Sequence, residues 1–232
     1  MPAGQDQRRA AQAYEIIRAE IISLAMPPGS TITENTVSSR LGFSRTPVRE
    51  ALIRLSDEGL VEIKPQLGTK ISLIDPASAF EALLIRRELE KLLAQRAAGK
   101  LDANLKKRFR DNLAAQRAAA KARDNDAFFQ ADDAFHRLIA VGAGLKRVPL
   151  VIDFAAVDLS RIRNMGIHVP GHTKTTIGEH VEIFSALEKG GAKEAQHSIS
   201  RHLRSVFCSF EQLWTRNPDW FVPGFDWTSQ EF

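Results

Sequence analysis

Cysteine is almost absent from this chain, and long apolar runs are absent altogether. Cys208 is the single cysteine among the 232 residues, so the sequence predicts neither a disulfide framework nor a thiolate zinc site. It contains no run of about eighteen apolar residues, which argues against a membrane-spanning helix. The N-terminal stretch MPAGQDQRRAAQ also lacks the apolar segment of a secretory signal. We therefore expect a cytoplasmic protein with no membrane partner.

A local excess of positive charge is missing as well. The whole chain has a formal net charge of +4, but residues 1–75 hold nine basic and nine acidic side chains. Charge alone therefore says nothing about nucleic acid, and a DNA-binding role must rest on where particular arginines lie. Histidine is distributed unevenly, because all six lie in the second half of the chain.

The first 75 residues carry the pattern of three helices followed by a small hairpin. Apolar spacing and turn residues predict helices over 8–25, 33–42 and 44–55, and strands over 60–64 and 69–74. Pro47 suits the first turn of the third helix, where a missing N–H costs nothing. This order of elements is typical of a winged helix-turn-helix domain, which we place at residues 1–75.

From residue 76 onward only helical patterns occur, so the fold class is mainly α. The predicted helices span 76–98, 102–122, 125–141, 147–165, 174–189 and 192–216. Successive helices with short connections predict an all-α antiparallel bundle over residues 76–216. The segment 217–232 is rich in proline and aromatic residues, and we expect it to be irregular.

The third predicted helix carries the side chains that could read DNA. Arg45 and Arg49 are four residues apart and share one helix face, and arginine bonds guanine O6 and N7 in bidentate fashion. Ser44 and Thr46 at the helix start could reach phosphate oxygens, and Gly68 would let the hairpin backbone approach the duplex. Taken alone, this segment could be a capped amphipathic helix with solvated arginines. The helix, turn, helix and hairpin in sequence favour DNA binding.

Four residues of the second half have the spacing of a metal site. Asp132 and His136 are four residues apart on one helix face, and His180 and His202 lie almost equally far before and after the Gly190-Gly191 break. A carboxylate and three imidazoles inside a bundle suit a divalent ion. We predict zinc, with nickel or manganese as alternatives. Each residue alone could be an ordinary polar contact, and the paired spacings favour the site.

Residues 10–74 resemble the winged-helix domain of the GntR family of transcription regulators, whose signature corresponds to the stretch SRTPVREAL from Ser44 to Leu52. Leu67 departs from the family, which usually has a basic residue before the wing glycine. The resemblance implies operator contacts from residues at the positions Asn35, Arg45, Thr46, Arg49 and Gly68.

Residues 76–216 resemble the FCD ligand-binding domain of the FadR-type GntR regulators. The matching stretches are Ile85–Glu90, Asp132–His136, Glu179-His180 and His202-Leu203. The resemblance implies that Asp132, His136, His180 and His202 are metal ligands, and that a small organic acid binds nearby. Arg86 and Arg163 are the arginines expected to pair with its carboxylate.

Together these features predict a homodimeric repressor that binds an inverted-repeat operator and responds to the acid. One alternative is a helical metal-dependent hydrolase attached to a DNA-binding domain. It lacks a well-placed general base, since Glu179 adjoins His180 but points away from it. A metal sensor without an organic effector is the other alternative. The attached DNA-reading domain favours a regulator over an enzyme.

Overall fold

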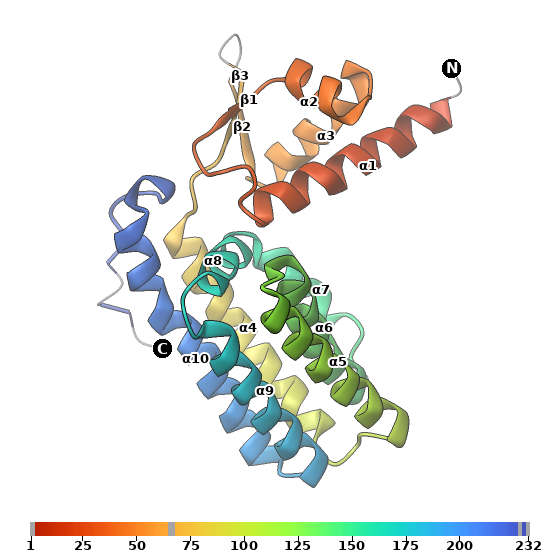
Figure 1. Ribbon diagram of the computed structural model, residues 1–232, viewed down its shortest axis with the longest axis vertical. Coiled ribbons are helices and arrows are strands. Elements are labelled where there is room, and N and C mark those ends of the chain that lie inside the picture. Colours follow the sequence, from red (N-terminus) through yellow and green to blue (C-terminus); the bar gives the residue numbers. More distant parts are fainter. Residues whose placement is uncertain (1–2, 65–67, 227–228, 231–232) are drawn as a thin grey trace. The chain divides into compact units, whose positions relative to one another are not determined.

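The computed structural model describes residues 3–64, 68–226 and 229–230 of the chain (Figure 1). It divides into two compact units. The first comprises Met1–Pro76 with Arg216–Gly224, and the second Ala77–Thr215 with Phe225–Phe232. The predicted fold class, a winged helix-turn-helix followed by an all-α bundle, is confirmed. None of the described helices is both long and apolar enough to cross a membrane.

In its described residues, the winged unit contains three α-helices and a three-stranded antiparallel sheet. They are α1 (Ala3–Ile22), β1 (Thr31–Ile32), α2 (Glu34–Leu41), α3 (Arg45–Asp57), β2 (Val61–Lys64) and β3 (Gly68–Ile71). The strand order is β1-β3-β2, with Lys64 opposite Gly68 in the hairpin. The two-residue strand β1 was not predicted, because so short a segment carries no alternating pattern. Leu67 and the rest of the hairpin tip lie outside the described residues.

Local sequence explains how α2 and α3 are held in the helix-turn-helix. Thr33 and Thr36 form a capping box at the start of α2. Gly42 ends α2 in the left-handed conformation, at a φ of 66°, which lets the chain turn sharply into α3. The apolar stripe of α3 is fully buried and packs against α1; it comprises Val48, Ala51, Leu52 and Leu55. The opposite face of α3 is thereby left to solvent.

The segment expected to be irregular contains ordered structure. Pro218–Trp220 form the short 3-10 helix η1. Phe221 is 3% exposed and pairs with Ile74 in a parallel bridge, in which Val222 N donates to Ile74 O at 2.9 Å. These residues belong to the winged unit, although they follow the last helix of the chain.

The described residues of the helical unit form seven helices. They are α4 (Pro76–Ala97), α5 (Ala103–Ala122), α6 (Asn125–Ala143), α7 (Val148–Ala155), α8 (Val157–Ile167), α9 (His172–Lys189) and α10 (Ala192–Arg216). Within this unit, α5 packs against α6 and α9 (Figure 1). Asp102 and Asp124 cap α5 and α6 through side-chain hydrogen bonds.

One predicted helix was wrong. The span 147–165 is two helices, because the backbone leaves the helical conformation at Ala156, with φ −95° and ψ 20°. No glycine or proline marks this break in the sequence, so the apolar pattern reads as continuous. The break lets α8 turn separately from α7 and bring Arg163 to the interior of the unit.

Candidate metal centre and DNA-binding surface

The structure brings the four predicted metal ligands together inside the helical unit. Asp132 and His136 come from α6, His180 from α9 and His202 from α10. One ligand atom of each lies within 4.8 Å of those of the others, and all four residues are buried. This agrees with the helical spacing, which sets the first pair on one face and the second pair level across a hairpin.

Each of the three imidazole rings is oriented by a hydrogen bond from its Nδ1 atom. His136 Nδ1 lies 2.6 Å from Glu90 Oε2, His180 Nδ1 lies 2.9 Å from Gln116 Oε1, and His202 Nδ1 lies 2.8 Å from Glu179 Oε2. Since all three partners are acceptors, each Nδ1 carries the proton and donates. The Nε2 atoms are therefore left with free lone pairs, which is the tautomer that a metal ligand needs.

Two of these lone pairs are buried without a hydrogen bond. Among the described residues, the Nε2 atoms of His136 and His180 have no hydrogen-bond partner, and neither atom reaches solvent. His180 Nε2 is 3.5 Å from Asp132 Oδ1, and neither bears a proton to share. Burying unsatisfied acceptors side by side destabilises a fold unless a cation joins them. The donor set therefore fits a divalent ion.

The charges of the centre agree with this fit. Burial, and next the proximity of His202, hold the pKa of His180 well below its ordinary value, so the ring is neutral. Burial also opposes the charge of Asp132, but the carboxyl keeps a pKa below its ordinary value, and the adjacent Arg163 guanidinium is the main cause of this lowering. A neutral imidazole and an ionised carboxylate are the protonation states that metal ligation requires.

A hydrogen-bond chain supports His180 from a neighbouring helix. Gln116 Nε2 donates to Asn112 Oδ1 at 2.7 Å, and Asn112 Nδ2 donates to the backbone oxygen of Ala131 at 2.9 Å. Both amides belong to α5, and Ala131 immediately precedes Asp132 on α6. The chain thus connects ligands of two helices through a third.

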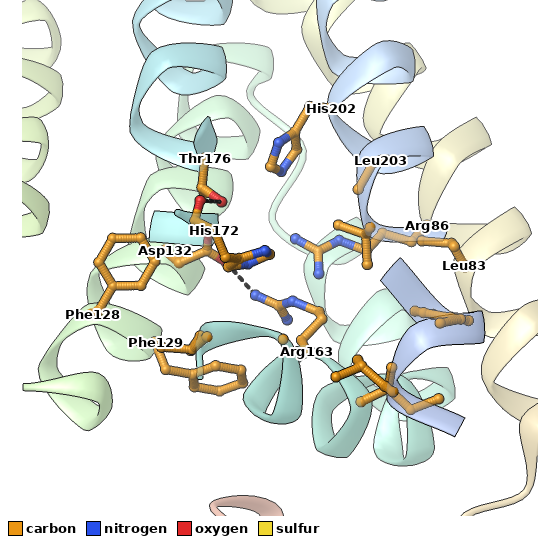
Figure 2. A pocket seen from close by; sticks show the side chains of 16 residues that line it. Leu83, Arg86, Phe128, Phe129, Asp132, Arg163, His172, Thr176, His202 and Leu203 are labelled. Carbon is orange, nitrogen blue, oxygen red and sulfur yellow. Dashed lines mark hydrogen bonds and ion pairs between the residues drawn. The ribbon is translucent and has the colours of Figure 1, made fainter. Parts of the chain in front are cut away.

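The two arginines predicted for the effector line one cavity beside the metal ligands (Figure 2). Arg86 Nε donates to Glu90 Oε1 at 2.7 Å, and Arg163 pairs with Asp132 and, at 2.8 Å, with Asp133. The cavity encloses about 530 Å³ of space between atoms, part of it open to solvent. Figure 2 shows the charged ends of Arg86 and Arg163 turned toward its centre.

Sequence reasoning missed several residues of this site. His172 precedes the predicted helix 174–189, but in the structure it is the first residue of α9 and lines the cavity, where burial lowers its pKa. Glu90 could have been suspected from its position four residues after Arg86 on one helix face. Gln116 and Thr176 carry no sequence signal, since polar side chains at such positions are common on exposed helix faces.

The residues predicted to contact DNA lie on the surface of the winged unit. Five are exposed, namely Asn35, Ser44, Arg45, Thr46 and Arg49, and Gly68 is half-buried at the start of β3 with a φ of 91°. Arg49 forms a bidentate ion pair with Glu34, the first residue of α2, at 2.7 and 2.9 Å. The fork of Arg49 is thus held outside the apolar core. Arg54 is instead held 3.9 Å over the Tyr14 ring.

Comparisons with known proteins match both halves of the chain. The profile described as "Bacterial regulatory proteins, gntR family" matches residues 9–71, and that of the FCD domain matches residues 81–205. The "HTH-type transcriptional repressor RspR" of Escherichia coli K12 is 32% identical over 210 residues, which cover 90% of this chain and 92% of that protein.

Two further similarities extend over almost the whole chain. An "Uncharacterized HTH-type transcriptional regulator in unstable DNA locus" of Streptomyces ambofaciens is 33% identical over 219 residues, covering 94% of this chain and 91% of that protein. Among solved structures, "E. coli McbR/YncC" superposes with a TM-score of 0.76 at 18% identity, covering 89% of this chain and 98% of that one. The latter shows a shared fold.

Proposed function

Because the chain belongs to the gntR family of bacterial regulatory proteins and carries an FCD domain, we propose that it is a repressor controlled by a small organic acid. The acid binds beside a divalent metal ion in the helical unit, and its binding changes operator affinity. The observation that carries the metal site is the pair of buried, unpartnered Nε2 atoms of His136 and His180.

Asp132, His136, His180 and His202 would hold the ion. Three imidazole nitrogens and one carboxylate oxygen without a thiolate suit zinc, and also nickel or manganese. When bound, the ion supplies an electrophilic position that attracts the acid's carboxylate. Arg86 and Arg163 line the adjoining cavity and would pair with the same group.

The winged unit would read the operator through α3. The exposed positions of Arg45 and Arg49 support base contacts in a major groove, while Ser44, Thr46, Asn35 and the backbone at Gly68 would contact phosphates. The name of the similar RspR protein supports repression rather than activation. By linkage, an acid that prefers one state of the repressor shifts the population between DNA-binding and released states.

A homodimer is supported by apolar side chains that α7 exposes. Leu150 is 65% exposed, Val151 53% and Phe154 88%. A second copy would cover this face by two-fold symmetry, and two winged units would then match an inverted repeat. Phe154→Ser should shift the sedimentation coefficient toward the monomer, whereas Val141→Ser at another exposed position should leave it unchanged. A dimer of undiminished stability in Phe154→Ser would contradict this interface.

The direct test uses operator fragments recovered from a randomised duplex pool by the zinc-loaded protein. Fluorescence anisotropy of these fragments is measured with zinc, after chelation, and with a panel of organic acids. We expect at least one acid to change operator affinity in the zinc-loaded protein and to lose its effect after chelation. Operator affinity that no acid and no chelator alters would overturn the proposal.

A further inference from the structure

The cavity beside the metal ligands is polar at its centre and apolar around it. Arg86, Asp132, Arg163, His172 and His202 supply its charged and imidazole groups (Figure 2). The apolar side chains come from α4, α6, α8 and α10 and include Leu83, Phe128, Phe129, Ile162, Leu203 and Phe210. A ligand that fills the cavity therefore needs one anionic group and a body that gains from leaving water.

Several polar groups that line the cavity already have partners within the helical unit. The Thr176 hydroxyl donates to the His172 backbone oxygen at 3.0 Å, and the Arg86 guanidinium donates to Glu90. Arg163 pairs with two carboxylates and lies 4.9 Å over the Phe129 ring. A polyhydroxylated ligand would lose several hydrogen bonds to water and find few replacements here.

The net charge of the metal site limits how many carboxylates a bound effector can carry. Around the metal site, the guanidinium groups of Arg86 and Arg163 face four carboxylates. These belong to Glu90, Asp132, Asp133 and Glu179. A divalent ion makes this set neutral, provided the ligand imidazoles are neutral. One ligand carboxylate then adds a single negative charge beside the ion. A second one would be buried among carboxylates without a cation of its own.

We propose that the effector is a monocarboxylic acid with an apolar body, either aromatic or aliphatic, rather than a sugar acid or a dicarboxylate. This inference rests on the proposed function, because it takes the carboxylate to bind at the metal ion and Arg86. The apolar body occupies the space between the aromatic rings of α6 and the apolar side chains of α10.

Calorimetric titration of the zinc-loaded full chain with four carboxylic acids tests the proposal. Benzoate and hexanoate are compared with gluconate, which has the same charge and many hydroxyl groups, and with succinate, which has a second carboxylate. We expect benzoate or hexanoate to bind at least about tenfold more tightly than the other two. Tighter binding of gluconate or succinate would overturn this inference and leave the proposed function intact.

The same titration distinguishes failure of the proposed function from failure of this inference alone. If none of the four acids nor any other carboxylate binds the zinc-loaded protein, the proposed function and this inference both fail. Benzyl alcohol provides the remaining comparison, because it keeps the aromatic body and lacks the carboxylate. Its binding should be too weak to measure. If it bound as tightly as benzoate, the carboxylate would not be needed, and both the proposed function and this inference would be contradicted.

A variant of the cavity wall gives an independent test. Val206 is half-buried and lines the cavity, so Val206→Asn places an amide among the apolar side chains. Benzoate affinity should fall about tenfold while zinc affinity stays unchanged. The matched control is Val181→Asn on the exposed side of α9, which should alter neither. Unchanged benzoate affinity in Val206→Asn would contradict the placement of the apolar body.

Discussion

The two units of the molecule place their polar groups in opposite ways. Among the described residues of the winged unit, Thr69 is the one buried polar residue, and the arginines of α3 are exposed. The helical unit buries many, including Arg86, Glu90, Gln116, Asp132, His136, His180 and His202. The winged unit therefore has an apolar core that is separate from the exposed residues predicted to contact DNA. In the helical unit the site lies within the core, so ligand binding and stability are linked there.

Removal of the metal ion should produce the largest difference in thermal stability between the two units. Chelation leaves buried imidazole lone pairs unsatisfied in the helical unit, and the winged unit has no ligand in the site. With zinc at about a thousand times its Kd, the loss amounts to about 4 kcal/mol of unfolding free energy. Differential scanning calorimetry should show one transition moving to lower temperature while the other stays. Equal shifts of both transitions, or no shift of either, would contradict the assignment of the metal site to the helical unit alone.

The second largest effect is expected when the hydrogen bond that orients His180 is removed. Gln116→Met removes the acceptor of the His180 Nδ1 proton while keeping the side-chain volume similar. Loss of such a positioning contact weakens metal affinity about 10- to 100-fold. Competition with a chromophoric zinc chelator measures it. Gln95→Met, at an exposed position of α4, is the matched control and should bind zinc as the wild type does. Wild-type zinc affinity in Gln116→Met would show that the ring is held by packing alone.

A surface substitution should have a different signature, with function lost and stability kept. Arg49→Ala should weaken operator binding by about 1–3 kcal/mol, because a bidentate base contact is lost. Its thermal unfolding should be unchanged, since the side chain is 63% exposed. Arg54→Ala on the same helix serves as the control, because Arg54 is held over Tyr14. An equal loss on random duplex DNA would show that Arg49 contacts phosphate instead.

The smallest expected effect is a loss of stability of the winged unit at alkaline pH. Burial, and next a 2.5 Å hydrogen bond donated to Glu58, raise the pKa of Tyr14 from 10.0 to about 12. The stabilisation from this contact is therefore complete below pH 10 and is lost as the pH rises toward 12. Tyr14 is the single tyrosine of the chain, so phenolate absorbance reports on it alone. Glu58→Gln should lower the midpoint, whereas chelation should leave it in place.

Local sequence rules were sufficient for the features that depend on spacing along one helix or one hairpin. They include the amphipathic helix α3 and the convergence of Asp132, His136, His180 and His202. In each case, helix geometry fixes which side chains share a face. The ligand cluster therefore follows from the sequence more directly than its surroundings do.

The surroundings of the site depend on how helices are rotated against one another. Gln116 reaches His180 across 64 positions of the chain, and Glu90 reaches His136 across 46. Nothing in the spacing of one helix determines such partners. The break at Ala156 was missed for a related reason, because it is set by packing and no residue type marks it. The Arg49–Glu34 pair likewise joins two helices through a turn whose angle the sequence does not specify.

The hydrogen-bond chain from His180 through Gln116 and Asn112 has a fixed direction. It ends at the backbone oxygen of Ala131, a group that accepts and can never donate, whatever residue occupies that position. Asn112 must therefore turn its nitrogen toward α6, and Gln116 must turn its nitrogen toward Asn112. The proton of His180 must then lie on Nδ1. The tautomer of a side chain is in this way set by the peptide backbone of another helix. Substitutions at positions 112 and 116 are compatible with the centre only if they preserve that polarity.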